Sequence, residues 1–214
     1  PPMLNKPARA GSTTARAPNN NGAARSSVSI SVARGPVIPI KLGGDCPFDK
    51  RRKAIICTAM RVTINHTPRE CRIAIERSDG SRADTTFPHK GPFPHDAMHY
   101  AVERVMGMDN AFWGMVASGL HPEAIADLAK AAGHASASRA EVPQDHIVEL
   151  LQAERLVECF EADLWGGAGD PQTLREVFAA ACETSKVPCP ALSDDAIAAI
   201  RTEVAALQEQ WRTG

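Results

Sequence analysis

The sequence has few aromatic residues and no long apolar run. Aromatic side chains make up only 5% of the 214 residues, whereas apolar residues as a whole reach 43%. A core can therefore form, but it must be built mainly from aliphatic side chains and Met. No stretch approaches the roughly 18 apolar residues that a membrane-spanning helix requires, and the first residues lack the apolar stretch of a secretory signal. We therefore expect a cytoplasmic protein without membrane contact.

No two cysteines are arranged as Cys-x-x-Cys, the spacing most typical of a structural zinc site or a redox centre. A chain of this length can build a core without disulfides, so we expect most of its thiols to be reduced and buried. If two of them are linked, the spacing favours Cys182 with Cys189, which lie seven residues apart around a proline-containing loop. The six cysteines are Cys46, Cys57, Cys71, Cys159, Cys182 and Cys189.

Acidic residues are absent before Asp45, so the chain begins with a basic segment. Residues 1–26 are rich in Ala, Pro, Asn, Gly, Ser and Thr, and they hold few large apolar side chains. Such a segment buries too little surface to offset the entropy lost on ordering, which predicts a flexible basic arm. Its Arg-, Ser- and Ala-rich composition also resembles an organelle transit peptide, so an organelle-targeted location is the alternative.

The net charge of −1 conceals an asymmetry between the two halves of the chain. Residues 1–90 carry sixteen Lys and Arg against six Asp and Glu, whereas residues 91–214 carry eight against nineteen. A basic half of this kind favours a nucleic acid or an acidic protein as partner. Alternatively, the two halves attract each other within one fold.

Apolar residues alternate with polar ones in the first half, which is the period of a half-buried strand. Asp79-Gly80 at the centre of a turn predicts a hairpin between two of these strands. Three prolines and a glycine within residues 88–94 then interrupt the pattern. The strands are expected at about 28–33, 53–65, 71–77 and 82–87, with a short or edge segment at 37–40.

After this break the signals are helical, with capping residues and a period near 3.6. We predict an α+β fold in which a small antiparallel sheet is followed by a five- to six-helix body. Residues 27–214 would form a single domain with a β section at 27–90 and a helical section at 91–214. Its helices are expected at about 95–106, 109–119, 121–132, 143–165, 170–185 and 193–212.

The segment that begins at His95 carries the clearest chemical pattern. His95 and His99 are four residues apart and therefore lie on the same face of a helix, so that both imidazoles can reach one metal ion. Glu103 extends the row by one more turn. Apolar residues form the neighbouring stripe, which places the row at the edge of that stripe, where a pocket-lining row is expected.

His95-Asp96-x-x-His99 resembles the His-Glu-x-x-His motif of the zincin metallopeptidases over five residues. In that family the two histidines bind zinc and the glutamate acts as general base on the metal-bound water. The resemblance implies that His95 and His99 are ligands and that Asp96 is the base. Asp96 is one methylene shorter than glutamate, and an aspartate in a first helical turn can instead complement the helix dipole or cap backbone N–H groups.

A third ligand is expected from the long helix at 143–165. Glu154, Glu158 and Glu161 fall toward its apolar side, where a carboxylate is costly unless it is paired or bound to a metal. Glu154 and Glu158 are the candidate ligands. They follow His99 by 55 and 59 residues, and a glutamate on a later helix is also the third ligand in some zincins. The alternative is that these glutamates edge the apolar stripe and stay solvated.

The sequence therefore predicts a protein that binds zinc or another divalent metal, and its motif further points to a zinc-dependent hydrolase. His95, His99 and either Glu154 or Glu158 would be the ligands. Asp96 or Glu103 would serve as general base or hold a ligand in place. The alternative is a non-catalytic interaction protein that binds nucleic acid or an acidic partner through residues 1–90, with structural histidines.

Overall fold

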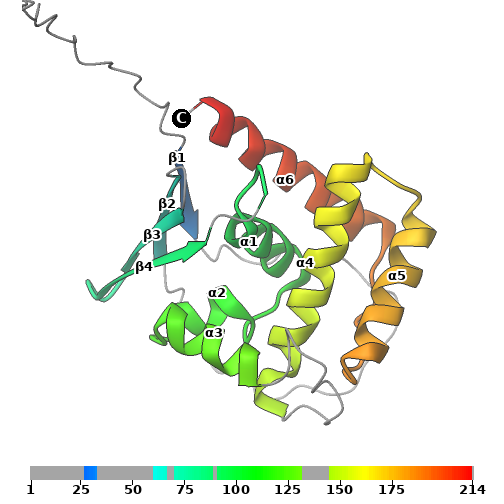
Figure 1. Ribbon diagram of the computed structural model, residues 1–214, viewed down its shortest axis with the longest axis horizontal. Coiled ribbons are helices and arrows are strands. Elements are labelled where there is room, and N and C mark those ends of the chain that lie inside the picture. The colour runs from blue at the N-terminus through cyan, green and yellow to red at the C-terminus, as the bar shows by residue number, and fades with distance from the viewer. Residues whose placement is uncertain (1–26, 33–59, 67–69, 89–90, 132–144, 214) are drawn as a thin grey trace, which may run out of the picture.

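A computed structural model describes residues 27–32, 60–66, 70–88, 91–131 and 145–213. Within these ranges, a four-stranded antiparallel sheet is followed by six α-helices and one 3-10 turn (Figure 1). The prediction of an α+β fold with a sheet followed by helices is confirmed. The predicted arm at residues 1–26 and the segment at 37–40 lie outside these ranges.

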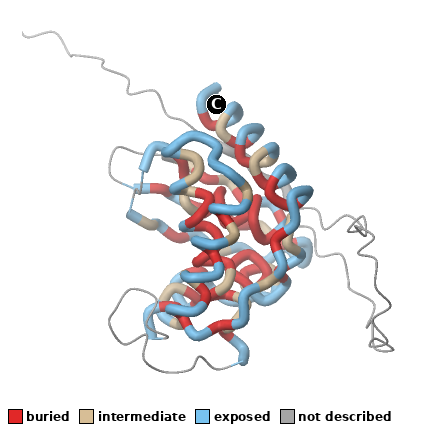
Figure 2. The backbone as a smooth tube through the Cα atoms, turned by 90° about the vertical axis from the view of Figure 1, so that its right-hand side faces the viewer, coloured by how far each residue is buried: buried red, intermediate tan, exposed pale blue. Residues whose placement is uncertain are grey.

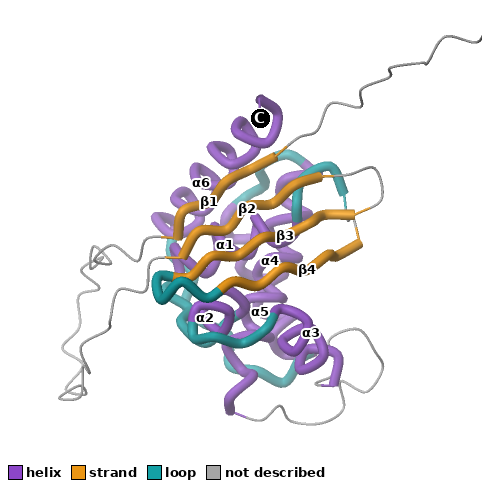
Figure 3. Tube along the Cα trace, turned by 90° about the vertical axis from the view of Figure 1, so that its left-hand side faces the viewer, coloured by secondary structure: helices purple, strands orange, loops and turns teal. Residues whose placement is uncertain are grey.

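The sheet has the strand order β1-β2-β3-β4, so that neighbours in sequence are neighbours in space (Figure 3). Val62 of β2 pairs with Ile75 of β3, and Ile64 pairs with Ile73. These four side chains are buried on one face of the sheet, against the helices. The strands are β1 (Ser27–Val32), β2 (Met60–His66), β3 (Glu70–Arg77) and β4 (Arg82–Pro88).

The helices begin close to where the sequence predicts them. Asp170 caps α5 by accepting from Thr173 N at 3.0 Å, and Ser193 Oγ accepts from Ala196 N at 3.1 Å at the start of α6. None of the described helices is long and apolar enough to cross a membrane. The helices are α1 (His95–Met106), α2 (Phe112–Ala117), α3 (Pro122–Ala131), α4 (Val148–Gly166), α5 (Pro171–Thr184) and α6 (Asp194–Thr213), with a 3-10 turn, η1 (Asp145–Ile147), before α4.

Helix α1 lies at the centre of the molecule. It stands between the sheet and α4, and it also contacts α2 and α6 (Figure 1). Every residue from 96 to 103 is buried, and the tube in Figure 2 shows this burial through the interior. The sequence placed His99 and Glu103 at the edge of an apolar stripe. The structure buries both, because neighbours cover α1 on all sides rather than along one stripe.

The connection from α1 to α2 packs tightly against Gly114. A Cβ atom at position 114 would lie 1.9 Å from the backbone oxygen of Asp109, so that only glycine fits. The backbone oxygen of Asp109 thus packs against Gly114. Asp109 is not the N-cap of the helix that the sequence placed at 109–119. Helix α2 begins only at Phe112, after Ala111, without a side-chain cap. This contact fixes α2 beside α1.

We expect Gly114→Ala to destabilise the fold by about 1–3 kcal/mol, although alanine favours helix formation, because the backbone of Asp109 must move. Gly166→Ala is the control, since it lies at the end of α4 and a Cβ there meets nothing within 4 Å. That control should leave the free energy of unfolding unchanged or raise it by less than about 1 kcal/mol. Urea unfolding measures both, and equal effects would contradict the packing described.

Candidate metal centre

The two histidines of the sequence motif face the same side of α4. The ring centroids of His95 and His99 lie 4.8 Å apart, one helical turn from each other on α1. His95 contacts both Glu154 and Glu161, whereas His99 contacts Glu154. The order of these contacts shows that α1 and α4 run in opposite directions where they meet.

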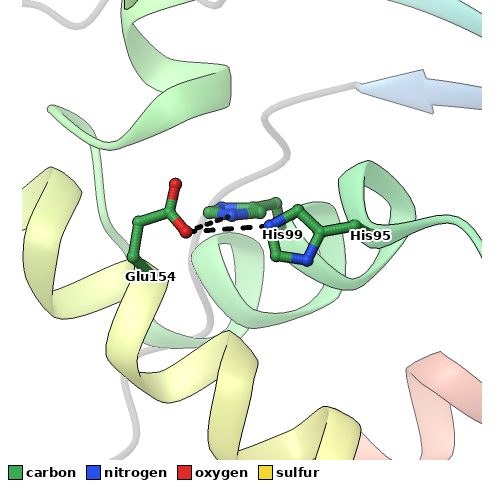
Figure 4. A group of neighbouring side chains, drawn as sticks. All are labelled: His95, His99 and Glu154. Carbon is green, nitrogen blue, oxygen red and sulfur yellow. Dashed lines mark ion pairs between the residues drawn. The ribbon is translucent and has the colours of Figure 1, made fainter. Parts of the chain in front are cut away.

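The Nε2 atoms of both histidines point toward one carboxylate oxygen of Glu154 (Figure 4). Glu154 Oε2 is 3.7 Å from Nε2 of His95 and 3.5 Å from Nε2 of His99. Ligand atoms about 2.0–2.1 Å from a tetrahedral zinc ion lie roughly 3.3 Å from one another. One ligand atom from each of the three residues lies within 4.8 Å of the others, so the group could hold a metal ion.

Each histidine is held at its other ring nitrogen by a separate carboxylate. Nδ1 of His95 lies 2.9 Å from Oε1 of Glu161, and Nδ1 of His99 lies 3.0 Å from Oε1 of Glu103. An Nδ1–H that donates to a carboxylate leaves the Nε2 lone pair available in the neutral ring. Metal-ligating histidines commonly have such an arrangement, which fixes both tautomer and ring orientation.

Both carboxylate oxygens of Glu103 have a hydrogen-bond partner. While Oε1 meets His99, Oε2 accepts a hydrogen bond of 2.8 Å from the backbone N–H of Trp113. Burial raises the pKa of this carboxyl, and the hydrogen bond and charge of His99 oppose that shift. Both oxygens of Glu103 are thus engaged, one in orienting His99 and the other in binding the backbone of Trp113.

The pKa values of both histidines are raised, so the two rings hold their protons strongly. Burial by itself lowers the pKa of His99, but the charge of Glu154 and the hydrogen bonds with Glu103 and Glu154 outweigh burial and raise it to about 10. For His95, burial again lowers the pKa, while the hydrogen bonds with Glu154 and Glu161 raise it above its usual value. The carboxylates around the two rings thus require positive charge, which protons or a cation can supply.

Asp96 lies beside the cluster and is not an N-cap. Helix α1 has Pro94 at its N-cap position without a side-chain cap, and Asp96 is only 9% exposed. Burial raises the pKa of this carboxyl, and the charges of His95 and His99 lower it. Within the part of the chain that the structure describes, its own backbone N–H is the one donor found for its side chain.

Of the two glutamates that the sequence offered as third ligand, the structure brings only Glu154 to the histidines. The side chain of Glu158 is 45% exposed and pairs with Arg155 at 2.8 Å, outside the cluster. Glu161, which the sequence places on the same side of the helix as Glu154 but not among the ligands, reaches His95 instead. Helix geometry accounts for this, because a residue seven positions after Glu154 is rotated by only about 20° and one four positions after it by about 40°.

Trp113 was also missing from the expected site, although it supports both ends of the motif. Its backbone N–H donates to Glu103, and its indole Nε1–H donates to the backbone oxygen of Asp96 at 2.9 Å. Phe112 lies beside it and packs its ring 5.8 Å from that of His99. No helical period in α1 points to this residue, since it comes from another helix.

The hypothesis of a nucleic acid or acidic partner rests mainly on residues outside the described ranges. In the sheet, Arg61 and Arg82 lie on the exposed face and both contact Glu76, at 3.8 and 2.8 Å. This arrangement neither requires nor opposes an external partner. The partner hypothesis for residues 1–90 stays a prediction.

The buried pair of His99 and Glu103 should be strongly coupled in metal-depleted protein. A double-mutant cycle with His99→Ala and Glu103→Ala is expected to give about 1.5–3 kcal/mol, because the hydrogen bond is charged and shielded from water. The matched cycle with His95→Ala and Glu161→Ala should give about 0.5–1 kcal/mol, since water reaches both side chains. Chemical denaturation of the seven proteins, the wild type being common to both cycles, measures this difference, and equal couplings would contradict it.

No family model, curated protein or solved structure matches this chain. The ligand atoms of the cluster, their partners and their burial therefore indicate its chemistry. On these grounds, His95, His99 and Glu154 form a group able to hold a metal ion.

Proposed function

We propose that the protein binds one divalent transition metal ion, zinc being the first candidate, through Nε2 of His95, Nε2 of His99 and the carboxylate of Glu154. The proposal rests on one observation: the two ring nitrogens of each histidine face different partners. Both Nε2 atoms face one oxygen of Glu154, while separate carboxylates hold the Nδ1 atoms. Two imidazoles and a carboxylate are a ligand set that zinc accepts.

We further propose a hydrolytic role, which depends on the number of ligands. Structural zinc sites are closed by four protein ligands, whereas catalytic sites have three and leave a position for water. The cluster offers three from the described part of the chain. A metal ion bound there would lower the pKa of its water toward neutrality.

Asp96 is the proposed general base. Glu103, the other candidate from the sequence, already uses both oxygens on His99 and Trp113. Asp96 is buried, lies one residue after His95 and keeps its carboxylate outside the network that orients the histidines. It occupies the motif position that the base holds in the zincins, which supports this assignment.

Substrate would approach from the side of His95. The side chains of His95 and Glu161 are 19% and 17% exposed, whereas those of His99 and Glu154 are 3% and 11% exposed. Among these four residues, solvent access is therefore greatest near the N-terminal end of α1. Phe112 forms part of the apolar surroundings on the His99 side.

The purified protein should contain about one zinc ion per chain, measured by elemental analysis after dialysis against a weak chelator. His95→Ala, His99→Ala and Glu154→Gln should each lose most of this metal, since two remaining ligands hold zinc weakly. Glu158→Gln is the matched control one turn further along α4, and it should retain the metal. Wild-type protein without stoichiometric metal after growth in zinc-supplemented medium would contradict the proposed site.

Asp96→Asn separates a catalytic from a structural role for this carboxyl. The variant should keep its zinc and its fold, while zinc-dependent hydrolysis of an activated ester such as 4-nitrophenyl acetate falls by about 100-fold or more. The His99→Ala variant supplies the metal-free background rate. Zinc-loaded wild type no faster than that background would refute the hydrolytic proposal, and Asp96→Asn as active as wild type would refute Asp96 as the base. Neither result would bear on metal binding.

A further inference from the structure

Three cysteines converge on the side of α4 that faces away from the metal cluster. Cys159 lies on α4, Cys182 on α5, and Cys189 in the connection between α5 and α6. The thiol of Cys189 lies 3.6 Å from the carbonyl oxygen of Pro190, and both Cys189 and Cys159 are near enough to Cys182 to raise the pKa of its thiol. Cys159 follows the ligand Glu154 by five residues, a rotation of about 140° around the helix, so the two sites are separate.

The backbone at the end of α5 brings Cys189 back toward Cys182. The N–H of Val187 donates to the carbonyl of Cys182 at 3.1 Å, and that of Lys186 donates to Glu183 at 3.0 Å. With Lys186 in the left-handed conformation at φ 54°, these bonds form a Schellman motif, which ends the helix and turns the chain. The chain therefore turns back toward α5 between residues 182 and 189.

A side-chain contact holds this returning segment against α4. Gln152 Nε2 donates to the carbonyl of Pro188 at 2.6 Å, directly before Cys189. The pairing of the two thiols is thus supported from α4 as well as from α5. It is also the pair that the sequence spacing favours.

The two thiols differ in solvent exposure, as a site of disulfide exchange requires. Cys189 is exposed, so small molecules in solution can reach it, whereas Cys182 is fully buried. Burial raises the pKa of Cys182 to about 12, and the nearby guanidinium of Arg155 opposes that shift. The exposed thiol is therefore the one that meets a reagent first, and the buried one reacts second.

We propose that Cys182 and Cys189 form a reversible disulfide by exchange with a small-molecule disulfide. The Cys189 thiolate attacks one sulfur of that molecule, which forms a mixed disulfide and releases one small thiolate. The Cys182 thiolate then attacks Cys189 Sγ and expels the second small thiolate. The two cysteines are oxidised by two electrons, the small disulfide is reduced to two thiols, and the two protons that the cysteines lose end on those thiols.

A disulfide places its sulfurs about 2.05 Å apart, so closure brings the two thiols together by rotation about their side-chain bonds. Cys159 stays reduced, because the other two thiols combine with each other. The bond would fasten the end of α5 to the segment that Gln152 holds on α4.

The test uses the full chain, equilibrated with mixtures of reduced and oxidised glutathione and then blocked with an alkylating reagent. Trypsin cuts after Arg175, Lys186 and Arg201, so Cys182 and Cys189 fall on separate peptides, 176–186 and 187–201. We expect these peptides to appear joined as the main oxidised product and to separate after dithiothreitol. Cys159→Ala should form the same product, and Cys189→Ser should abolish it.

Three results would overturn the proposal. The first is complete alkylation of Cys182 and Cys189 under all glutathione mixtures. The second is a stable glutathione adduct on Cys189 without joining of the two peptides, and the third is preferential linkage of either cysteine to another one. Circular dichroism of Cys189→Ser verifies that this variant is folded, and Cys182→Ala provides a second variant if it is not.

Discussion

The hydrogen bonds of two imidazoles, one buried and one half-buried, with separate carboxylates are the constraint around which the rest of the site is built. His99 and Glu103 are almost fully buried on a helix that has neighbours on every side. A carboxylate in such a place is stable only when hydrogen bonds and positive charge accompany it. The Nδ1 contacts satisfy Glu103 and Glu161, and they direct both Nε2 atoms toward Glu154.

The surrounding fold serves to hold these groups in register. Helix α4 supplies Glu154 and Glu161, two turns apart, against the two histidines of α1. Helix α2 adds the backbone N–H of Trp113 to Glu103, and α2 can come this close because Gly114 admits the backbone of Asp109. The sheet covers another side of α1 with an apolar face. A polar centre is thus enclosed by elements whose own contacts are largely apolar.

The sequence predicts the elements well where local signals are strong, as at the Asp79-Gly80 hairpin and the caps Asp170 and Ser193. It also identifies the row of His95, His99 and Glu103 on α1, because four-residue spacing determines which side chains share a face. What it misses depends on the relation between helices. The choice between Glu158 and Glu161 and the role of Trp113 follow from how α4 and α2 pack on α1, which no period within one helix specifies.

X-ray absorption at the zinc edge of the zinc-loaded protein tests the central claim most directly. The account predicts nitrogen and oxygen neighbours at about 2.0–2.1 Å, with the outer-shell scattering of two imidazoles and no sulfur. The Glu158→Gln protein should give the same spectrum. Sulfur neighbours at about 2.3 Å would instead place the metal on cysteines, and a shell without imidazole scattering would contradict the assignment of His95 and His99 as ligands.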